Sequence, residues 1–213
     1  MQFGVDEAGK GPVLGSMFAA AVLATPEEIP DAVDDSKRLD PPRRRSIAES
    51  LHSNADVRIG ISEIPVERID DPETDMNTLT VEAHAAALSA VAADDLAGLI
   101  DAGDTDADRF ARRVESRVAS EVSIEARHHA DAENPLVAAA SIVAKVERDA
   151  HVEDLQSRYD TPIGSGYPGD ETTRTFLEDY VREQGALPAC ARSSWRTSRD
   201  VLAAAEQTGL TDF

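Results

Sequence analysis

Four acidic residues are candidates for chemistry because of where they stand. Asp6 and Glu7 close the first apolar segment, Asp101 closes a later one, and Asp131 shortly precedes a long apolar helix. Open α/β sheets bind ligands in the crevices at strand ends, so these carboxylates can converge although they are far apart in sequence. Four negative charges together repel strongly unless a cation neutralises them. Oxygen ligands without His or Cys suit Mg²⁺ or Mn²⁺, and two such ions can drive phosphodiester hydrolysis.

The acidic composition supplies a competing interpretation, in which any given Asp is a solvated surface group. The chain has 41 Asp and Glu against 21 Lys and Arg, which gives a formal net charge of -20. Hydrated carboxylates keep a protein in solution at molar salt, where repulsion is screened within about 3 Å. Lysine is scarce as well, since Lys10, Lys37 and Lys145 are the three in the chain. The composition therefore favours a halophilic protein over an ordinary acidic one.

The elements that must position the four acids form an α/β fold. Three predicted strands precede an alternation of helices and strands, which indicates a mixed five-stranded sheet flanked by helices. Strands are expected over residues 2–5, 17–23, 57–64, 97–100 and 122–126, and helices from residue 41, over 81–93 and 108–118, from 135 to 159, and near 171–183 and 200–207. We expect a catalytic domain over residues 1–160 and a C-terminal helical extension over 161–213, packed on the same unit.

The sequence also bears on where the protein resides and on whether disulfides stabilise it. The longest wholly apolar run, Met17–Ala24, is far shorter than the roughly 20 residues that a membrane helix needs. Met1 leads directly into strand-like sequence with no basic leader. The single cysteine, Cys190, excludes an intrachain disulfide and is typical of a reducing compartment. We expect a cytoplasmic monomer that binds no membrane.

The stretch DEAGKGP, Asp6–Pro12, resembles the signature of type 2 ribonuclease H. Further blocks match in the family order and together cover residues 3–196: Asp35–Leu39, Asp101–Ala102, His128–Asp131, Ala139–Asp149 and Gly164–Pro168. The resemblance is to archaeal-type members, and the composition points to an extreme halophile. It implies a ribonuclease H-like fold, Asp6, Glu7, Asp101 and Asp131 as catalytic metal ligands, and RNA embedded in or paired with DNA as the substrate.

The same resemblance assigns residues to substrate recognition. Gly9, Lys10 and Gly11 would bring bare backbone close to the nucleic acid, where it can hydrogen-bond a 2′-hydroxyl, and Lys10 would contact a phosphate. Without the flanking acids, this Gly-Lys-Gly would read as a simple tight turn. Tyr167 resembles the family tyrosine that stacks on the sugar at the RNA/DNA junction, although a lone tyrosine is commonly half-buried core.

For other polar residues of the matched blocks, a role in substrate binding is harder to separate from a role in packing. Lys37, Lys145 and Arg148 are expected to contact phosphates, because all three lysines of the chain fall inside matched blocks. Ser141 and Lys145 are four residues apart on one predicted helix face, which is consistent with a shared ligand and equally with simple packing. His129 stands where archaeal-type relatives are expected to carry a lysine, which puts a phosphate role there in doubt.

The resemblance implies a Mg²⁺- or Mn²⁺-dependent endonuclease using two ions. It would cut the RNA strand of RNA/DNA hybrids and the 5′ side of single ribonucleotides in duplex DNA, leaving 3′-hydroxyl and 5′-phosphate ends. The alternatives are another ribonuclease H-fold nuclease, such as a junction resolvase, and a non-catalytic cation-binding protein that uses acids such as Asp104–Asp108. Under the favoured hypothesis, Asp104 and Asp106 are dispensable. The tail Gly209–Phe213 either binds a sliding clamp or is a frayed terminus.

Overall fold

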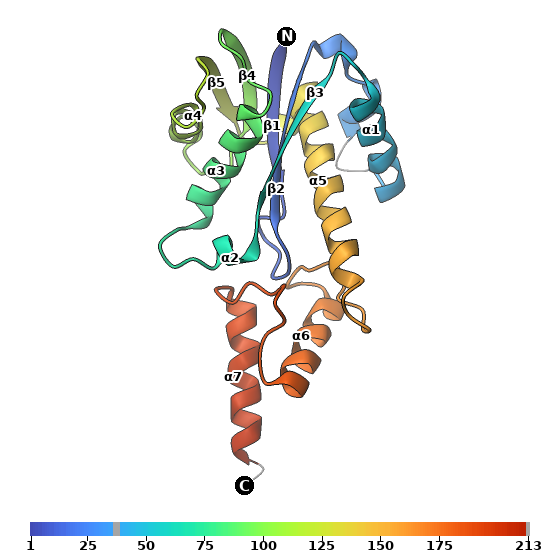
Figure 1. Ribbon diagram of the computed structural model, residues 1–213, viewed down its shortest axis with the longest axis vertical. Coiled ribbons are helices and arrows are strands. Elements are labelled where there is room, and N and C mark those ends of the chain that lie inside the picture. Colours follow the sequence, from blue (N-terminus) through green and yellow to red (C-terminus); the bar gives the residue numbers. More distant parts are fainter. Residues whose placement is uncertain (36–38, 212–213) are drawn as a thin grey trace. The chain divides into compact units, whose positions relative to one another are not determined.

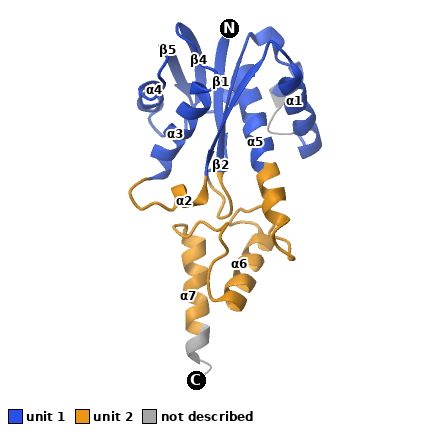
Figure 2. Ribbon diagram, in the orientation of Figure 1, with its two compact units in different colours: residues 1–10, 17–64, 75–148 blue, residues 11–16, 65–74, 149–213 orange. Residues whose placement is uncertain are grey.

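The computed structural model describes residues 1–35 and 39–211. Lys37 and the tail residues Asp212 and Phe213 therefore lie outside the described residues. The chain divides into two compact units, shown in Figure 2: unit 1 comprises residues 1–10, 17–64 and 75–148, and unit 2 comprises residues 11–16, 65–74 and 149–213. The domain boundary expected at residue 160 stays a prediction. Within the described ranges, no helix is both long and apolar enough to span a membrane.

Unit 1 carries all the strands and the helices that cover them (Figure 1). Its elements are β1 Gln2–Ala8, β2 Met17–Ala24, α1 Pro41–Ser53, β3 Arg58–Ile64, α3 Met76–Ser89, β4 Leu96–Asp101, α4 Ala107–Glu115 and β5 Val122–Arg127, with the 3-10 turns η1 Pro26–Glu28, η2 Asp31–Asp35 and η3 Ala130–Ala132. The helix α5, Pro135–Gln156, begins in unit 1 and ends in unit 2. Unit 2 holds α2 Val66–Ile69, α6 Glu171–Gln184 and α7 Arg196–Thr211.

The strands form one five-stranded sheet in the order β3-β2-β1-β4-β5. β2 runs antiparallel to β1 and β3, whereas β4 runs parallel to β1 and β5. The mixed five-stranded sheet predicted from the sequence is thus confirmed. Because β1 and β4 are parallel neighbours, their carboxyl ends, which carry the first three candidate acids, meet at the same edge of the sheet.

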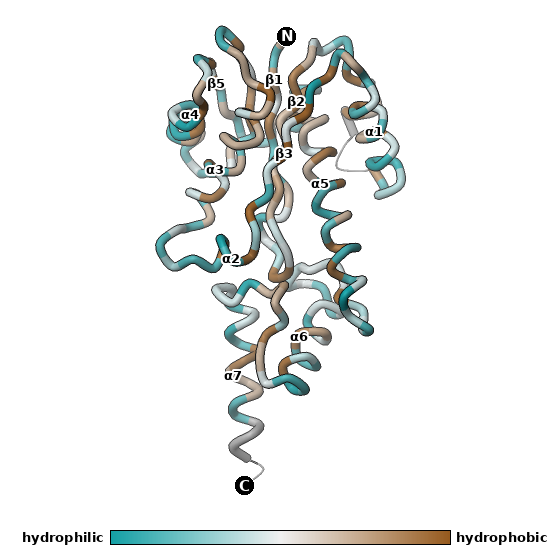
Figure 3. The backbone as a smooth tube through the Cα atoms, viewed as in Figure 1, coloured by the Kyte–Doolittle hydropathy of each residue, from teal (hydrophilic) through white to brown (hydrophobic). Residues whose placement is uncertain are grey.

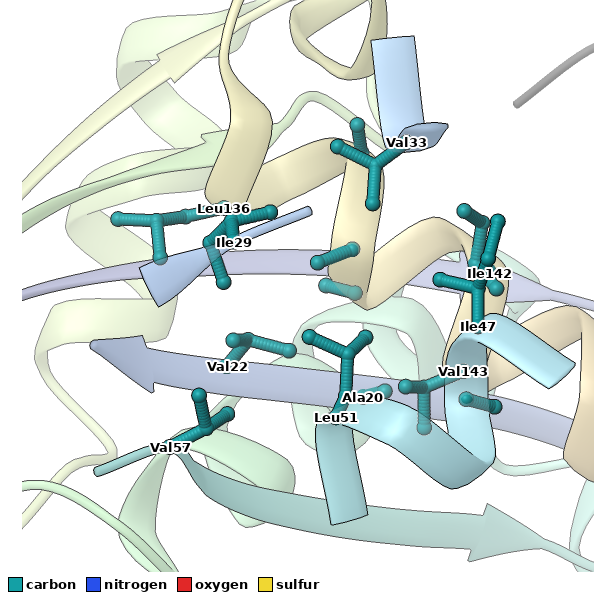
Figure 4. Close-up of a cluster of buried hydrophobic side chains, with 14 of the residues drawn as sticks. Ala20, Val22, Ile29, Val33, Ile47, Leu51, Val57, Leu136, Ile142 and Val143 are labelled. Atoms are coloured by element: carbon teal, nitrogen blue, oxygen red, sulfur yellow. The ribbon is translucent and has the colours of Figure 1, made fainter. Parts of the chain in front are cut away.

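The apolar core of unit 1 lies between β2, α1 and the first part of α5 (Figure 4). Val22 of β2, Leu51 of α1 and Ile142 of α5 are almost completely buried in this cluster, and burial of each such side chain contributes about 1.5–3 kcal/mol. Gly4 lets α5 approach β1, since a Cβ atom at this position would lie 2.3 Å from the backbone of Leu136. The start of α5 is therefore fixed against the strand that carries Asp6 and Glu7.

The opposite face of the sheet is covered by α3, which packs on β1, β2 and β3, while α4 packs on β5. Figure 3 shows hydrophobic residues along the central strands and largely hydrophilic residues on α1 and α4. The helix predicted over 81–93 in fact begins at Met76, because the Asp75 carboxylate accepts hydrogen bonds from the backbone of Asn77 and Thr78. The sequence prediction missed this cap and placed the helix start one turn too late.

Unit 2 has a separate apolar core. It is built from the residues Val13, Leu14, Leu155, Ile163, Phe176, Leu177, Cys190 and Ala191. The ring of Tyr159 packs edge-on against Phe176, with 5.0 Å between ring centroids. The final helix is longer than the predicted 200–207, since α7 begins at Arg196. Unit 2 thus joins the β1–β2 connection, the segment after β3 and the C-terminal part of the chain.

Candidate active site

Asp6 and Glu7 leave opposite faces of β1, since side chains alternate along a strand. The Ser141 hydroxyl of α5 hydrogen-bonds the Asp6 carboxylate. On the other face, Nε2 of His84 in α3 lies 2.7 Å from Oε2 of Glu7. The two neighbouring acids are therefore held by different helices.

The Asp6 carboxylate is buried and surrounded by other charges. Its pKa is raised well above the usual value, first by burial and then by the negative charges of Glu7 and Asp101. Ser141 and Lys145 oppose this shift. The Lys145 ammonium donates a 2.7 Å hydrogen bond to Ser141 Oγ, so the predicted i, i+4 pair is directed at Asp6. Asp6 thus lies where an additional cation would relieve an unfavourable charge.

Glu7 is stabilised in its ionised form by its neighbours. Burial would raise its pKa, but the hydrogen bond from His84 and the charge of Lys10 lower it overall. The Lys10 ammonium also donates to the backbone carbonyl of Gly103, in the loop after β4. Gly9, immediately before Lys10, has a φ of 92°, which is the left-handed region that favours glycine.

Asp101 and Asp131 complete the acidic group. Val5 pairs with Ile100 across β1 and β4, so Asp6 and Asp101 follow at the same level of the sheet. Asp101 Oδ1 accepts a 2.8 Å hydrogen bond from the Ala130 backbone amide, immediately before Asp131. The pKa of Asp101 is raised by burial and by the charges of Glu7 and Asp131, despite that hydrogen bond.

The four predicted acids therefore act on one another electrostatically. Each raised pKa reports that the carboxylates are ionised only at a cost, and a hard divalent cation is the group that removes it. The donor chemistry fits Mg²⁺ or Mn²⁺. In the described part of the chain, however, no three His, Cys, Asp or Glu side chains are gathered closely enough to hold an ion.

In unit 2, the loops that carry Gly11 and Tyr167 lie against each other. A Cβ atom at Gly11 would lie 3.8 Å from Cε1 of Tyr167, and the tyrosine side chain is 44% exposed. The Gly166 carbonyl accepts hydrogen bonds from the amides of Val13, at 2.8 Å, and Leu14, at 3.2 Å. The backbone after the glycine turn and the exposed aromatic ring are thus fixed relative to each other.

A third segment, residues 188–195, supports the same loops. Arg192 is completely buried, and its Nε donates a 2.8 Å hydrogen bond to the Gly15 carbonyl. Its backbone amide donates to the Val13 carbonyl at 2.8 Å. The guanidinium also lies over the ring of Trp195, 4.9 Å from its centroid. The sequence prediction did not identify Arg192, because it belongs to no recognised block and to no helix or strand.

Asp70 fastens this third segment to the chain after β3. Its carboxylate accepts hydrogen bonds from the backbone amides of Ser193, at 2.7 Å, and Ser194, at 3.0 Å, and from both serine hydroxyls. Burial would raise the pKa of Asp70, but these four donors lower it overall. We name the hydrogen-bonded set of residues 11–16, 163–173 and 188–195, with Asp70, the loop assembly.

The comparisons with known proteins agree with the motifs. The Ribonuclease HII family model matches residues 3–198. The chain belongs to the ribonuclease HII family. Ribonuclease HII from Halobacterium salinarum is 62% identical over 212 residues, covering 100% of this chain and 99% of that protein.

Two solved structures extend the likeness to the fold. The ribonuclease H2 from Pyrococcus horikoshii has a TM-score of 0.89 and 33% identity, and the match covers 96% of this chain and 98% of that one. Ribonuclease HII in a complex with PCNA from Archaeoglobus fulgidus has a TM-score of 0.81 and 32% identity, covering 94% and 96%. The ribonuclease H-like fold, the archaeal type and the halophilic kinship predicted from the sequence are confirmed. The chain is a divalent-metal-dependent endoribonuclease that acts on RNA/DNA substrates.

The other residues that the ribonuclease HII resemblance assigned are distributed as follows. Arg148 is buried on α5, near the end of unit 1. His129 is exposed and has a φ of 61°, uncommon for a residue with a Cβ atom. Lys37 lies outside the described residues. The roles of these residues and of Gly9, Lys10, Gly11, Lys145 and Tyr167 toward substrate stay predictions.

The acids of the cation-binding alternative serve the local fold. Asp104 is buried, and Arg109 Nη2 lies 2.8 and 2.7 Å from its two carboxylate oxygens. The Arg109 hydrogen bond lowers the pKa of Asp104 to about 2. Asp106 caps α4 by accepting from the Arg109 amide at 2.9 Å. That Asp104 and Asp106 are dispensable for cleavage stays a prediction, but removal of the Asp104 carboxylate would leave Arg109 without this partner.

Proposed function

We propose that this ribonuclease HII cuts the RNA strand of RNA/DNA hybrids and, more characteristically, the 5′ side of a lone ribonucleotide in duplex DNA. The products would carry 3′-hydroxyl and 5′-phosphate ends. The biological role is then the removal of misincorporated ribonucleotides and of primer remnants. The single observation that carries the substrate assignment is the pairing of Gly11 with the exposed ring of Tyr167. A bare backbone can meet a 2′-hydroxyl, and an adjacent ring can stack on the neighbouring sugar.

Asp6, Glu7, Asp101 and Asp131 are the proposed ligands of two Mg²⁺ or Mn²⁺ ions. Such ions, when bound, supply an activated water and neutralise charge on the phosphate. Asp6 would be the ligand that the two ions share, and its carboxylate interacts with the charges of both Glu7 and Asp101. Ser141 and Lys145 orient the Asp6 carboxylate through their chain of hydrogen bonds. His84 orients Glu7 from the other face of the sheet.

The basic residues are proposed to bind the phosphates of the substrate. Lys10 follows the acids directly, and its ammonium reaches the Gly103 carbonyl in the loop after Asp101. Lys145, Arg148 and Lys37 are the further candidates. Because Lys145 already donates to Ser141, we assign it to Asp6 first and to phosphate second.

A duplex DNA with one embedded ribonucleotide tests the proposal. We expect a single cut on the 5′ side of the ribose, with no cut in the all-DNA duplex. A junction resolvase would instead cut a branched DNA, and a cation-binding protein would cut neither. Nucleic-acid binding normally weakens as salt rises. Here activity should instead rise as KCl increases into the molar range, because salt screens the repulsion between DNA and a chain of net charge -20. Cleavage of branched DNA alone would contradict the proposed substrate. Best activity at low salt would contradict the proposed salt dependence.

We also propose a monomer that acts in the cytoplasm and binds a sliding clamp through its C-terminal tail. The support for the clamp is the complex of the Archaeoglobus fulgidus ribonuclease HII with PCNA. Removal of residues 209–213 should abolish capture by the clamp while cleavage of short duplexes is unchanged. Equal capture with and without the tail would rule the tail out.

A further inference from the structure

His84 is a completely buried residue of α3, and one of its two ring nitrogens has a hydrogen-bond partner among the described residues. Its Nε2 lies 2.7 Å from Glu7 Oε2. Its Nδ1 is buried and has no hydrogen-bond partner among the described residues. The ring packs edge-on against Phe110, with 5.1 Å between centroids and an interplanar angle of 81°. Glu7 is thus the polar partner that the structure gives this imidazole.

This arrangement assigns the tautomer. A proton on Nδ1 would be a buried N–H without an acceptor, which is costly. A proton on Nε2 points at a carboxylate oxygen, which is the favourable arrangement. His84 therefore donates to Glu7 through Nε2, and Nδ1 takes no part in a hydrogen bond among the described residues.

Packing alone does not explain a histidine at this position. An apolar ring of similar size would retain the contact with Phe110 and would leave no buried nitrogen unpaired. His84 also lies outside every sequence block that carries the family resemblance. What the imidazole adds over an apolar ring is the hydrogen bond to Glu7.

That hydrogen bond fixes the direction of the Glu7 carboxylate. With Oε2 held by α3, Oε1 lies 3.4 Å from the position of a Cβ atom at Gly103, two residues after Asp101. Cγ2 of Thr80 and Cζ of Phe110 lie 2.5 and 3.3 Å from the same position. The free oxygen of Glu7 is therefore directed toward the loop that follows Asp101.

We propose that His84 is a positioning residue for metal binding, which holds Oε2 of Glu7 so that Oε1 is presented to the ion. The inference rests on the proposed function, in which Glu7 is a metal ligand. Hydrogen-bond partners of metal ligands typically contribute tenfold to hundredfold in metal affinity. His84 is expected to act in this range through Glu7, without touching the ion or the substrate.

The experiment measures Mn²⁺ binding to the full chain by titration calorimetry in molar KCl, independently of cleavage. His84→Phe keeps the ring and removes the donor, whereas His84→Gln places an amide nitrogen near the position of Nε2. We expect His84→Phe to weaken Mn²⁺ binding about tenfold or more, and His84→Gln to recover most of that loss. If His84→Phe does not fold, His84→Met replaces it, since it also lacks the donor.

Two further variants separate a positioning role from a structural one. In a Glu7→Gln background, His84→Phe should cause no additional loss of Mn²⁺ affinity, because its effect passes through the Glu7 carboxylate. Unchanged or tighter Mn²⁺ binding in His84→Phe, with weakened binding in Glu7→Gln, would overturn the inference and leave the proposed function intact. Unchanged binding in Glu7→Gln itself would instead overturn Glu7 as a metal ligand, and the role of His84 with it.

Discussion

The acidic group of unit 1 and the loop assembly of unit 2 hold their functional residues by opposite means. The acids are placed by strand alternation and by the register of β1 and β4, and Asp6 and Asp101 have raised pKa values. The loops are placed by hydrogen bonds between segments far apart in sequence, and Asp70 within them has a lowered pKa. In the acidic group the surroundings oppose the charges of Asp6 and Asp101, whereas in the loop assembly the chain itself supplies the partners of the Asp70 carboxylate.

This difference separates reaction from recognition. A cation relieves a carboxylate whose ionisation is costly, so under the proposed function the acidic group would gain stability when its metal binds. A loop whose polar groups are already paired keeps its shape before the substrate arrives, and pre-organisation reduces the cost of binding. Changes in the acidic group should therefore alter the reaction rate and metal dependence, whereas changes in the loop assembly should alter the choice of substrate.

The largest effect should come from neutralising single acids. Asp6→Asn, Asp101→Asn and Asp131→Asn should each lower the cleavage rate at least about a hundredfold, because each carboxylate both neutralises and positions a cation. Initial rates on a duplex with one ribonucleotide, at saturating Mn²⁺, measure the loss.

Asp106→Asn is the matched control. Asn also caps helices, so α4 should be retained and the rate should stay near that of the natural chain. Asp104 does not serve as a second control, because of its ion pair with Arg109. A loss at Asp106 as large as that at Asp101 would show that the site is wrongly placed.

Much of the fold could be predicted because its signals are local. Short apolar stretches marked the strands, with alternation over residues 57–64, and Asp40 before Pro41 marked the start of α1, where the carboxylate does accept from the Arg43 amide at 2.9 Å. The start of α3 was missed because its apolar pattern begins only after the cap at Asp75. Nothing in the sequence indicated that residues 11–16 and 65–74, from within its sheet-forming part, belong to unit 2.

The sequence could predict that the four acids lie near one another, because strand ends and matched blocks both point to them, while their role as metal ligands stays a prediction. The contact of His84 with Glu7 could not be predicted, because an Ala-rich apolar helix gives no sign that one of its buried positions lies against the Glu7 side chain. A histidine on the apolar face of a helix is the one signal that was available. Arg192 lies 177 positions from its partner Gly15 in the sequence. Asp70 lies 123 and 124 positions from Ser193 and Ser194. Only the tertiary structure brings residues so far apart in sequence together.

A smaller and more selective effect is expected at the exposed ring of the loop assembly. Tyr167→Ala should slow cleavage at a single embedded ribonucleotide about tenfold or more, since aromatic stacking contributes about 1–3 kcal/mol. The loss on a uniform RNA/DNA hybrid should be smaller, because cleavage there needs no deoxyribose at the stacking position. Initial rates on both substrates at matched Mn²⁺ decide the point. Tyr167→Phe is the control, and equal losses on both substrates would make Tyr167 a packing residue.

A weaker effect, of a few-fold, should follow when the loop assembly is loosened indirectly. Asp70→Ala leaves the amides and hydroxyls of Ser193 and Ser194 without their acceptor, which costs about 1 kcal/mol at this partly exposed position. KM for the single-ribonucleotide duplex should rise, while Mn²⁺ affinity should not change. Asp71→Ala, which removes an ion pair with Arg68, is the neighbouring control. A changed metal affinity in Asp70→Ala would show that the two regions are not separable.

The pH dependence of that variant has a definite sign. The pKa of Asp70 is lowered on folding, so its stabilisation is present at neutral pH and is lost as the pH falls through the lowered folded pKa. Asp70→Ala and the natural chain should therefore differ in Tm at neutral pH, and the difference should begin to shrink below a pH of about 4 and vanish below the lowered folded pKa. A difference that persists in acid would mean that the side chain acts by packing.

The smallest effect is expected for Asp6→Asn in the metal-free protein. The variant that loses activity in the first prediction should here gain thermal stability. The pKa of Asp6 is raised by burial and by Glu7 and Asp101, so the folded chain holds a proton there more tightly than the unfolded chain does. Stability then falls as the pH rises from about 4 through the folded pKa, and the penalty is complete above it. Asp6→Asn removes this penalty, and in chelator at neutral pH it should raise Tm by about 2–4 °C, which corresponds to about 1 kcal/mol at this chain length.

Excess Mn²⁺ should reverse the order of the two Tm values, because only the natural chain regains the binding free energy of the complete site. Thermal unfolding in molar KCl, with and without Mn²⁺, measures both, and Asp106→Asn should follow the natural chain throughout. A lower Tm for metal-free Asp6→Asn would show that the Asp6 carboxylate supports the fold, and the contrast between a region awaiting its cation and a region already satisfied would not hold.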